Sequence, residues 1–345
     1  MKHWRLVSLV FFIALFLGGC GEKSQSTLLP QGEVAKMQYD LLMLSTWIMV
    51  GVVAVVTIIF LYVVVKFRRK KGQEDVIPEQ VEGNHKLEII WTVIPIILLI
   101  ILAVPTVRDT FTLADTRPID GEEIPEDTVV VSAVAKLYWW EFEYQTPDGK
   151  NVVTAQDLVI PTGERVYIKL KGGDIKHSFW VPSLAGKMDT NTDNENKMYL
   201  QADNVGTYRG FCAEFCGPSH ALMQFQVKAV EPAEFDQWFE KMKTTKSVAT
   251  TDLAKQGEEI FNKSCIGCHA VDANGPATGV APNLSNFGDR DKVAGILDNT
   301  HDNVEKWLKD PDSIKPGNKM SGTYGDLSDH EINALAEYLK GLKLE

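Results

Sequence analysis

Cys212-Ala-Glu-Phe-Cys216-Gly-Pro-Ser-His220-Ala-Leu-Met223 places two thiols, an imidazole and a thioether within twelve residues. Soft sulfur ligands together with imidazole suit copper. A mononuclear blue-copper loop offers one cysteine, one histidine and one methionine, whereas this stretch offers two cysteines. Two thiolates can bridge two metal ions, and each ion then needs an imidazole of its own. His220 supplies one, and His177 is the candidate for the other, because residues 127–230 contain only these two histidines.

Two plainer interpretations of these residues stay open at this point. Cys212 and Cys216 could form a disulfide, and His177 could be an ordinary core histidine. A Cys-x-x-x-Cys pair alone would be weak evidence for a metal. The histidine four residues on, the methionine three further, and a spare histidine in the same segment favour copper on ligand chemistry.

The residues around this stretch have the pattern of short β-strands. Gly- and Pro-containing turns separate segments that are rich in Val and Ile or alternate in polarity. The predicted strands are 128–135, 152–160, 165–170, 199–211 and 223–230. Strands at this spacing predict a β-sandwich or barrel over residues 127–232. An amphipathic helix over 233–243 and a polar linker ending at 251 should follow.

A second metal motif lies in the last quarter of the chain. Cys265-Ile-Gly-Cys268-His269 is the c-type haem attachment motif, in which two thiols add to the haem vinyls and the adjacent imidazole meets the iron. A zinc site would require further Cys or His ligands, and no other cysteine is available. The sequence therefore predicts one covalent haem with His269 as an axial ligand.

The sixth iron ligand should come from a later loop. Pro316-Gly317-Asn318-Lys319-Met320 resembles the methionine-bearing loop of class I cytochromes c, and Met320 is the only methionine after Met242. Methionine and histidine ligation suits electron transfer. His301 and His330 are the alternative ligands. Pro282 resembles the proline of that family whose carbonyl orients the axial histidine.

Residues 252–345 read as an all-α domain around that haem. Asp252 can cap a helix that runs to about residue 262, and Ser328 can cap another over 329–342. A third helix is expected near 304–309. A small domain with so much loop needs something to fill its middle, and the haem does so.

The N-terminus has the charge, apolar core and small residues of an export signal over residues 1–19. Leu17-Gly18-Gly19-Cys20 resembles a bacterial lipobox, in which the cysteine receives diacylglycerol and becomes the new N-terminus. The alternative is ordinary cleavage, or none, with Cys20 unmodified. Residues 20–40 are then a polar tether outside the membrane.

Two apolar runs, 41–65 and 89–107, are long enough to form a transmembrane hairpin. The loop between them, 66–88, has six Lys and Arg residues, whereas 20–40 and 108–118 have two each. The positive-inside rule puts this loop in the cytoplasm. Both metal motifs are then on the outer side of the membrane.

Composition agrees with this organisation. The formal net charge of −11 argues against nucleic acid as a partner, because phosphate binding needs clustered Lys and Arg. The chain has five cysteines, and each belongs to one of the motifs above. If those interpretations hold, no cysteine is left for a disulfide.

At this point the residues support a family resemblance. Residues 212–223 with His177 resemble the binuclear copper motif of cytochrome c oxidase subunit II, which has a cupredoxin fold, and the two apolar spans match that subunit as well. The resemblance implies that Cys212 and Cys216 bridge the two coppers, with Met223 as a weak ligand. It also implies that His177 and His220 bind one copper each and that the Glu214 backbone carbonyl is a further copper ligand. The Glu214 carboxylate would bind a magnesium ion at the interface with subunit I.

The resemblance also bears on two further positions. Glu88 matches a glutamate near the entry of a proton pathway, although it could be a plain residue at the membrane boundary. Tyr138 stands in an aromatic stretch where the family usually has a tryptophan that receives electrons from soluble cytochrome c. The tyrosine argues against direct docking of a soluble donor there, and aromatic residues in strands are more often core.

The fused haem domain resembles the caa-type terminal oxidases of bacteria. This resemblance implies a subunit II that takes electrons from a cytochrome c donor through its haem and copper pair to subunit I. Oxygen would be reduced to water and protons pumped in subunit I, with subunit III as a further partner and membrane lipid around the hairpin. Three rivals stay open: a quinol oxidase subunit II, a copper-delivery or thiol-redox lipoprotein, and a free-standing electron carrier.

Overall fold

The structure is a computed structural model of the chain, and it describes residues 4, 7–8, 10–12, 22–72, 77, 79–80, 82–120, 128–146, 151–273 and 279–344. The chain divides into two compact units, residues 37–115 and residues 1–36 with 116–345. Cys20 and most of the expected signal peptide lie outside the described residues.

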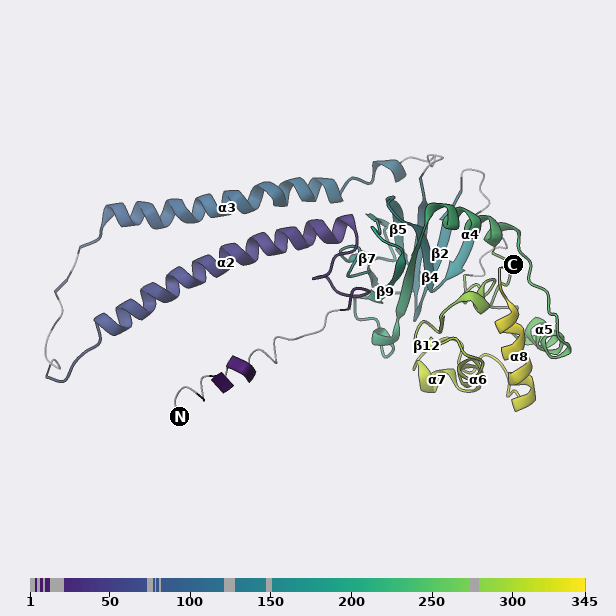
Figure 1. Cartoon of the computed structure of the whole chain (residues 1–345). Helices are drawn as coiled ribbons and strands as arrows, with labels where there is room; N and C mark the ends of the chain where they lie inside the picture. The colour runs from purple at the N-terminus through teal and green to yellow at the C-terminus, as the bar shows by residue number, and fades with distance from the viewer. Residues whose placement is uncertain are drawn as a thin grey trace. The chain divides into compact units, whose positions relative to one another are not determined.

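The first unit contains helix α3 (His85–Leu113) and most of helix α2 (Glu33–Lys66), both shown in Figure 1. Both are long and apolar enough to cross a membrane. Asn84 caps α3, where its side-chain oxygen accepts hydrogen bonds from the amides of Lys86 and Leu87. Helix α2 begins before the predicted run 41–65, and α3 extends beyond 89–107 at both ends.

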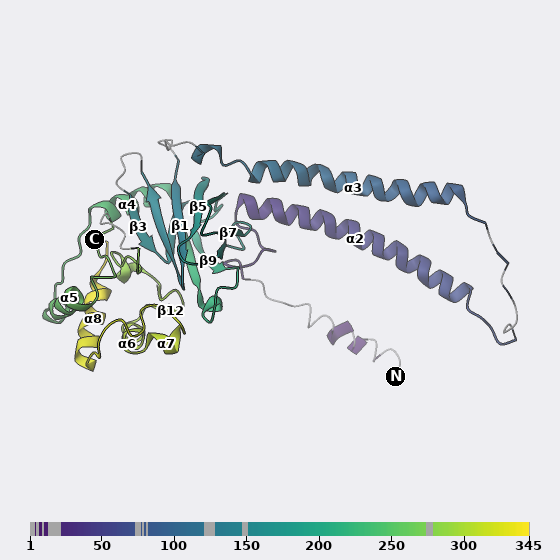
Figure 2. The same ribbon diagram turned by 180° about the vertical axis from the view of Figure 1, so that it is seen from behind.

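The second unit contains a β-sandwich of two five-stranded sheets, with the strand orders β3-β2-β1-β5-β8 and β4-β10-β9-β6-β7. Figures 1 and 2 show the strands from the two sides. The strands of the first sheet are β1 (Val130–Lys136), β2 (Trp139–Gln145), β3 (Val152–Ala155), β5 (Val166–Gly172) and β8 (Asn196–Leu200). The strands of the second sheet are β4 (Asp157–Pro161), β6 (His177–Trp180), β7 (Met188–Thr190), β9 (Gly206–Cys212) and β10 (Gln224–Val230).

Aromatic side chains fill the space between the sheets. The rings of Trp140 and Phe179 lie 5.6 Å apart, and those of Phe179 and Phe225 lie 4.8 Å apart. Such buried rings contribute much of the apolar area that stabilises a sandwich. Two of these rings stand on strands β6 and β10, which lie on either side of β9, the strand that ends at Cys212, so the core also positions that cysteine.

Two of the predicted strands are wrong, because each of them is two strands. The segment 152–160 breaks at Gln156, whose φ of 68° is left-handed, and continues as β4 in the other sheet. The Gln156 amide donates to the Trp140 carbonyl in one sheet, and its carbonyl accepts from the Gln226 amide in the other. The segment 199–211 likewise divides into β8 and β9 at a turn.

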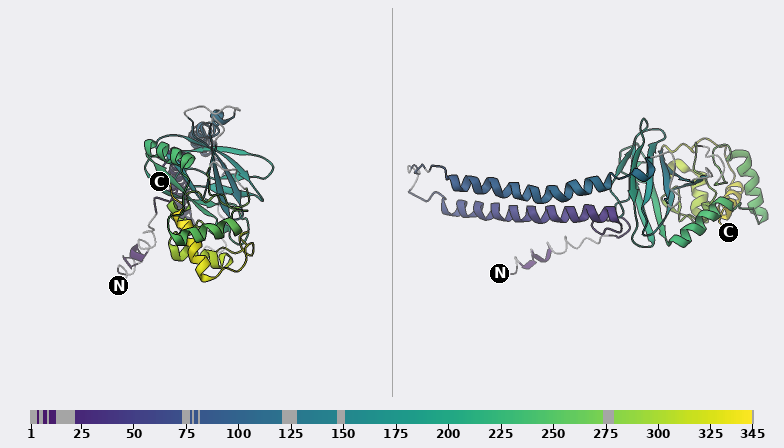
Figure 3. Two further views of the ribbon diagram at one scale, coloured as in Figure 1. Left: turned by 90° about the vertical axis from the view of Figure 1, so that its right-hand side faces the viewer. Right: turned by 90° about the horizontal axis from the view of Figure 1, so that it is seen from above.

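The C-terminal part is helical, as Figure 3 shows from two further sides. Helix α4 (Pro232–Thr244) leads into it from the sandwich, and 3-10 turns and one two-residue ladder, β11 (Lys292–Val293) with β12 (Leu297–Asp298), lie among its helices. Its helices are α5 (Asp252–Ser264), α6 (His301–Lys309), α7 (Pro311–Ile314) and α8 (Asp329–Gly341). The prediction of an all-α cytochrome-like domain is confirmed apart from that ladder.

Helix caps in this part were predicted with mixed success. Ser328 forms a capping box with Glu331 at the start of α8, as expected. The cap of α5 is Thr251 and not Asp252, because the Thr251 hydroxyl accepts a hydrogen bond from the Ala254 amide at 3.0 Å. Gly257 lies where α5 crosses α8, and a Cβ there would come within 2.0 Å of the Ala334 carbonyl oxygen.

Candidate metal centres

The first centre forms where the start of β6 meets the end of β9 and the loop that follows β9. His177 begins β6, Cys212 ends β9, and Cys216 lies in the loop between β9 and the turn His220–Leu222. Strand β6 pairs with β9, so that Phe179 is opposite Cys212. This register brings His177 to the cysteine loop although 35 residues separate it from Cys212.

Every predicted ligand of this centre lies close to one of the two thiols. His177 Nδ1 is 3.8 Å from Cys212 Sγ, and the two sulfur atoms are 3.9 Å apart. Cys216 Sγ is 3.6 Å from His220 Nδ1 and 3.9 Å from Met223 Sδ. The Glu214 carbonyl oxygen is 3.2 Å from Cys212 Sγ. One imidazole therefore faces each cysteine.

Both cysteines are free thiols. Their sulfur atoms are 3.9 Å apart, whereas a disulfide requires about 2.0 Å. His177, Cys212 and Cys216 also form a group whose ligand atoms all lie within 4.8 Å of one another. The disulfide interpretation is therefore not supported, and the donor set of two thiols, two imidazoles, a thioether and a carbonyl suits copper.

The loop is held by backbone hydrogen bonds. The Cys212 amide donates to the Met223 carbonyl, and the Ala213 amide donates to the Ser178 carbonyl. Gly217 has a φ of 128° and lies against Tyr138, where a Cβ would come within 2.5 Å of the Tyr138 hydroxyl oxygen. Only glycine fits that position.

The two thiols ionise unequally. Burial opposes the charge on both, but the hydrogen bond with His177 lowers the pKa of Cys212 to about 7. Burial and the adjacent Cys212 charge raise the pKa of Cys216 to about 12. Two neighbouring thiolates repel each other, so holding both ionised requires cations between them.

Asp174 is a residue of this centre that the sequence analysis missed. Its carboxylate lies 2.9 Å from His177 Nε2, which leaves Nδ1 facing the thiols. Burial opposes its charge, but hydrogen bonds from His177, from the amides of Leu137 and Ile175 and from Lys319 hold the pKa of Asp174 well below its usual range. A carboxylate three residues before a candidate ligand histidine was the available signal.

The second centre is a cavity in the helical part. Its wall includes both attachment cysteines, His269, Met320, Trp307 and Leu339. The His269 Nδ1 donates to the Pro282 carbonyl at 2.8 Å, as predicted, which directs Nε2 away from that loop. Burial lowers the pKa of His269 and so favours the neutral ring that a metal requires.

The alternative axial ligands lie elsewhere. His330 contacts Gln256 Oε1 at 3.1 Å on the surface, and His301 lies 3.8 Å from Glu305 at the start of α6. Neither is among the described residues that line the cavity, whereas Met320 is. The geometry therefore favours Met320.

Two buried basic side chains border the cavity. Burial lowers the pKa of Arg290 to about 10 and that of Lys315 to about 7. Both residues line the cavity. An apolar pocket with two thiols, an imidazole, a thioether and a buried arginine fits a haem, whose propionates are anionic.

The sandwich supplies part of this cavity's wall. Leu137, Tyr138, Trp139 and Gln156 line it together with the haem-motif residues. Tyr138 is only 5% exposed. It therefore lies between the cavity and Gly217, the residue that follows Cys216 in the thiol loop. The two candidate centres share Tyr138 as a boundary.

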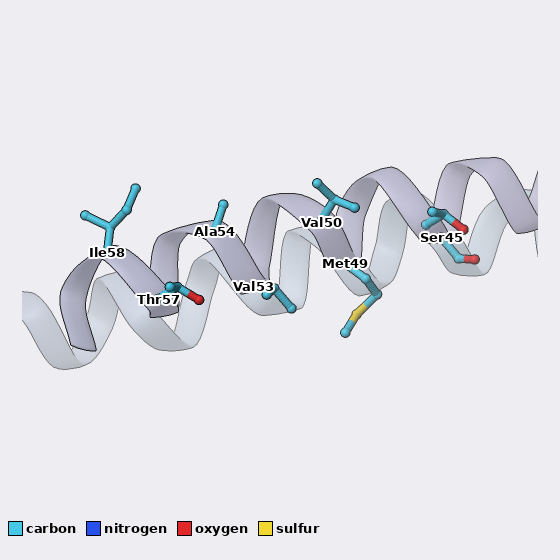
Figure 4. A pocket seen from close by; sticks show the side chains of 8 residues that line it. Ser45, Met49, Val50, Val53, Ala54, Thr57 and Ile58 are labelled. Carbon is cyan, nitrogen blue, oxygen red and sulfur yellow. The ribbon is translucent and has the colours of Figure 1, made fainter. Parts of the chain in front are cut away.

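Other features have no comparable chemistry. A shallow groove along α2, which contains Met49, Val53 and Thr57, has no ionisable side chain (Figure 4). Glu88 lies in the first turn of α3, where its carboxylate is 3.5 Å from His85. His301, Asp302 and Glu305 cluster on the surface, where acidic groups are common without a metal.

Three sequence profiles match successive parts of the chain. Residues 25–108 match "Cytochrome C oxidase subunit II, transmembrane domain". Residues 145–230 match "Cytochrome C oxidase subunit II, periplasmic domain". Residues 254–343 match "Cytochrome c".

Full-length relatives agree with these matches. The chain is 57% identical over 356 aligned positions to cytochrome c oxidase subunit 2 of Bacillus subtilis, with 100% of this chain and 99% of that protein covered. It is 56% identical to the protein of the same name from Bacillus sp. strain PS3, with 99% and 98% covered. A quinol oxidase subunit 2 of Bacillus anthracis is 35% identical, with 76% of this chain and 88% of that protein covered.

Proposed function

The chain belongs to the cytochrome c oxidase subunit II family, and from that premise we propose that it carries electrons from a c-type haem to a two-copper centre and on to subunit I. As a subunit 2 it is a component of an oxidoreductase complex. The oxygen-reducing site belongs to subunit I.

Six residues would hold the copper pair. Cys212 and Cys216 would bridge the ions, while His177 and His220 would bind one ion each. Met223 and the Glu214 carbonyl would complete the set, as their distances to the thiols support. When bound, the pair supplies reversible one-electron transfer. The protein's part is to hold six donors rigidly, so that little rearrangement accompanies a change of charge.

Five residues would hold and orient the haem. Cys265 and Cys268 would attach it covalently, and His269 and Met320 would bind the iron. The Pro282 carbonyl fixes the His269 ring. Methionine and histidine ligation raises the potential and closes the iron to substrates, which suits electron transfer.

One observation carries the proposed order of transfer. The haem cavity is lined on one side by Leu137, Tyr138 and Trp139 of the copper-binding domain. Tyr138 in turn contacts the loop of Cys216. A haem in this cavity would lie against the copper domain, so the cytochrome domain acts as its built-in donor. A separate cytochrome c would then deliver electrons to the haem.

The remaining assignments follow from family membership and topology. The two long apolar helices support a membrane location. The six Lys and Arg residues of 66–88 favour a cytoplasmic loop, which would put both metal domains outside. We propose residues 1–19 as a signal peptide and Cys20 as a lipid anchor. Glu214 would share a magnesium ion with subunit I, and Glu88 would lie near a proton entry. Proton pumping and contact with subunit III belong to the assembled complex.

A direct experiment is to purify the whole chain from membranes and count its metals. We expect one covalent haem, two coppers per chain and a mixed-valence two-copper paramagnetic signal. The Cys216→Ser variant should lose that signal and keep its haem. Copper near one per chain would refute the binuclear site, and purification without an oxygen-reducing partner would refute the oxidase role.

The rivals are weaker on these observations. A quinol oxidase subunit has no use for a copper set or a haem domain, yet both donor sets are complete here. A copper-delivery lipoprotein would not require a haem cavity walled by its copper domain. A free-standing carrier would share both sites, and the partner found in the purification distinguishes it.

A further inference from the structure

Asp174 contacts both domains at once. One carboxylate oxygen lies 2.9 Å from His177 Nε2, and the other accepts from the Leu137 amide at 2.8 Å and from Lys319 Nζ at 3.0 Å. Lys319 belongs to the helical domain and directly precedes Met320. A single side chain therefore connects a candidate copper ligand with the loop of the candidate haem ligand, across 145 residues of sequence.

The contact with His177 has a chemical consequence. A carboxylate that accepts the N–H of a ligand histidine fixes the ring and makes it a stronger donor to the metal. A stronger donor stabilises the oxidised, more highly charged metal. A neighbouring ammonium that shares the carboxylate weakens this effect, because it withdraws part of the negative charge from the histidine.

The Lys319 contact belongs to a wider junction. The Ser219 hydroxyl donates to the Pro316 carbonyl at 2.7 Å, and Lys228 contacts Asp291 at 3.0 Å. The Asp174 side chain is only 15% exposed, so its interaction with Lys319 is less screened than a surface pair. Lys319 reaches Asp174 only while the two domains are in contact.

We propose that Asp174 is a positioning residue that couples the seating of the cytochrome domain to the copper pair, so that contact with Lys319 makes the pair easier to reduce. This inference rests on the proposed function, because it presupposes copper on His177. Contact of the cytochrome domain with the sandwich would then favour transfer of an electron from its haem to the copper pair.

The test is a spectroelectrochemical titration of the full chain with both metal groups bound. Lys319→Gln should lower the midpoint potential of the copper pair. We expect the equilibrium constant for electron transfer from haem to copper to fall by up to about tenfold. This corresponds to a decrease of about 59 mV in the copper potential for one electron. Lys319→Arg keeps the charge and should restore the wild-type potential.

Lys309→Gln is the matched control. Lys309 is also an exposed lysine of the cytochrome domain in an ion pair, but its partner, Asp329, lies in the same domain at 2.8 Å. Its loss should leave the copper potential unchanged. Equal potentials in wild type and Lys319→Gln, or equal shifts in Lys309→Gln and Lys319→Gln, would overturn the proposal.

A double-mutant cycle separates coupling through Asp174 from a simple charge effect. Asp174→Asn should weaken copper binding roughly 10- to 100-fold. At saturating copper, Lys319→Gln should cause no further shift in the Asp174→Asn background. An undiminished shift there would show that Lys319 acts through space and refute the role of Asp174.

A second readout needs no copper. In the full chain with haem but without copper, Asp174→Asn and Lys319→Gln should both raise the rate of amide hydrogen exchange over residues 315–320. Lys309→Gln should leave this rate unchanged. Unchanged exchange in both variants would contradict the seating role. Failure of the wild-type chain to bind a copper pair would instead overturn the proposed function, and this inference with it.

Discussion

Gly317 and Gly322 offer a matched pair of substitutions for testing how the domains fit together. Both lie in the loop around Met320, with left-handed φ values of 74° and 72°. Alanine at either position costs about 1–2 kcal/mol in backbone energy. The two positions differ in their surroundings. A Cβ on Gly317 would lie 3.1 Å from Pro218 Cγ and 3.6 Å from the Tyr138 hydroxyl oxygen, whereas one on Gly322 has no neighbour within 4 Å.

Gly317→Ala should therefore have an additional effect on the contact between the domains. A contact of 3.1 Å requires Pro218 to move slightly, which costs about 1 kcal/mol, the low end of the range for overpacking; 1.4 kcal/mol corresponds to a tenfold change in an equilibrium constant. Because Pro218 and Tyr138 belong to the sandwich, this energy opposes seating of the cytochrome domain. It does not oppose folding of the cytochrome domain itself.

The assay is flash reduction of the haem followed by optical detection of copper reduction in the same chain. We expect Gly317→Ala to slow this step by up to about tenfold and Gly322→Ala to leave it near the wild-type rate. Both variants should lower the thermal stability of the helical domain to a similar extent. Equal transfer rates in the two variants would refute the docked geometry.

Three further predictions concern the helical domain alone. Met320→Ala should abolish the low-spin methionine–histidine spectrum, and an unchanged haem spectrum would exclude Met320 as ligand. Ser328→Ala removes the capping box of α8 and should lower the unfolding free energy by about 1 kcal/mol, measured by denaturant titration; a change near zero would contradict the role of the cap. Gly257→Ala should lower the unfolding free energy by about 3 kcal/mol, because its Cβ would meet the backbone of α8. A Cβ on Gly341 meets no atom within 4 Å, so Gly341→Ala should leave the stability unchanged. Similar stabilities of the two variants would refute the close helix crossing.

Both donor sets were predictable because most of their chemistry is local. Cys212, Cys216, His220 and Met223 lie within twelve residues, and the haem motif lies within five. His177 is distant in sequence but was found by elimination, since its domain has few histidines. Pro282 followed from a family resemblance, and its hydrogen bond to His269 is present.

Contacts between distant segments left no pattern in the sequence. Asp174 meets Lys319 across 145 residues, and no composition or periodicity reports such a pair. The break at Gln156 is hidden in the sequence because the β-branched run 152–154 before it and the apolar run 158–160 after it both favour strand, while a single left-handed residue moves the chain into the other sheet. Tyr138 was noticed as a departure from a family pattern, but its place in the wall of the haem cavity required the structure.

In the proposed function, the haem domain is the built-in electron donor of the copper pair. The most direct test of this role is the rate of copper reduction after flash reduction of the haem, measured in the purified chain over a wide range of protein concentration. An intramolecular donor predicts a first-order rate that does not change with concentration. A rate that rises in proportion to concentration, or a reduced haem that never reduces the copper, would contradict the account.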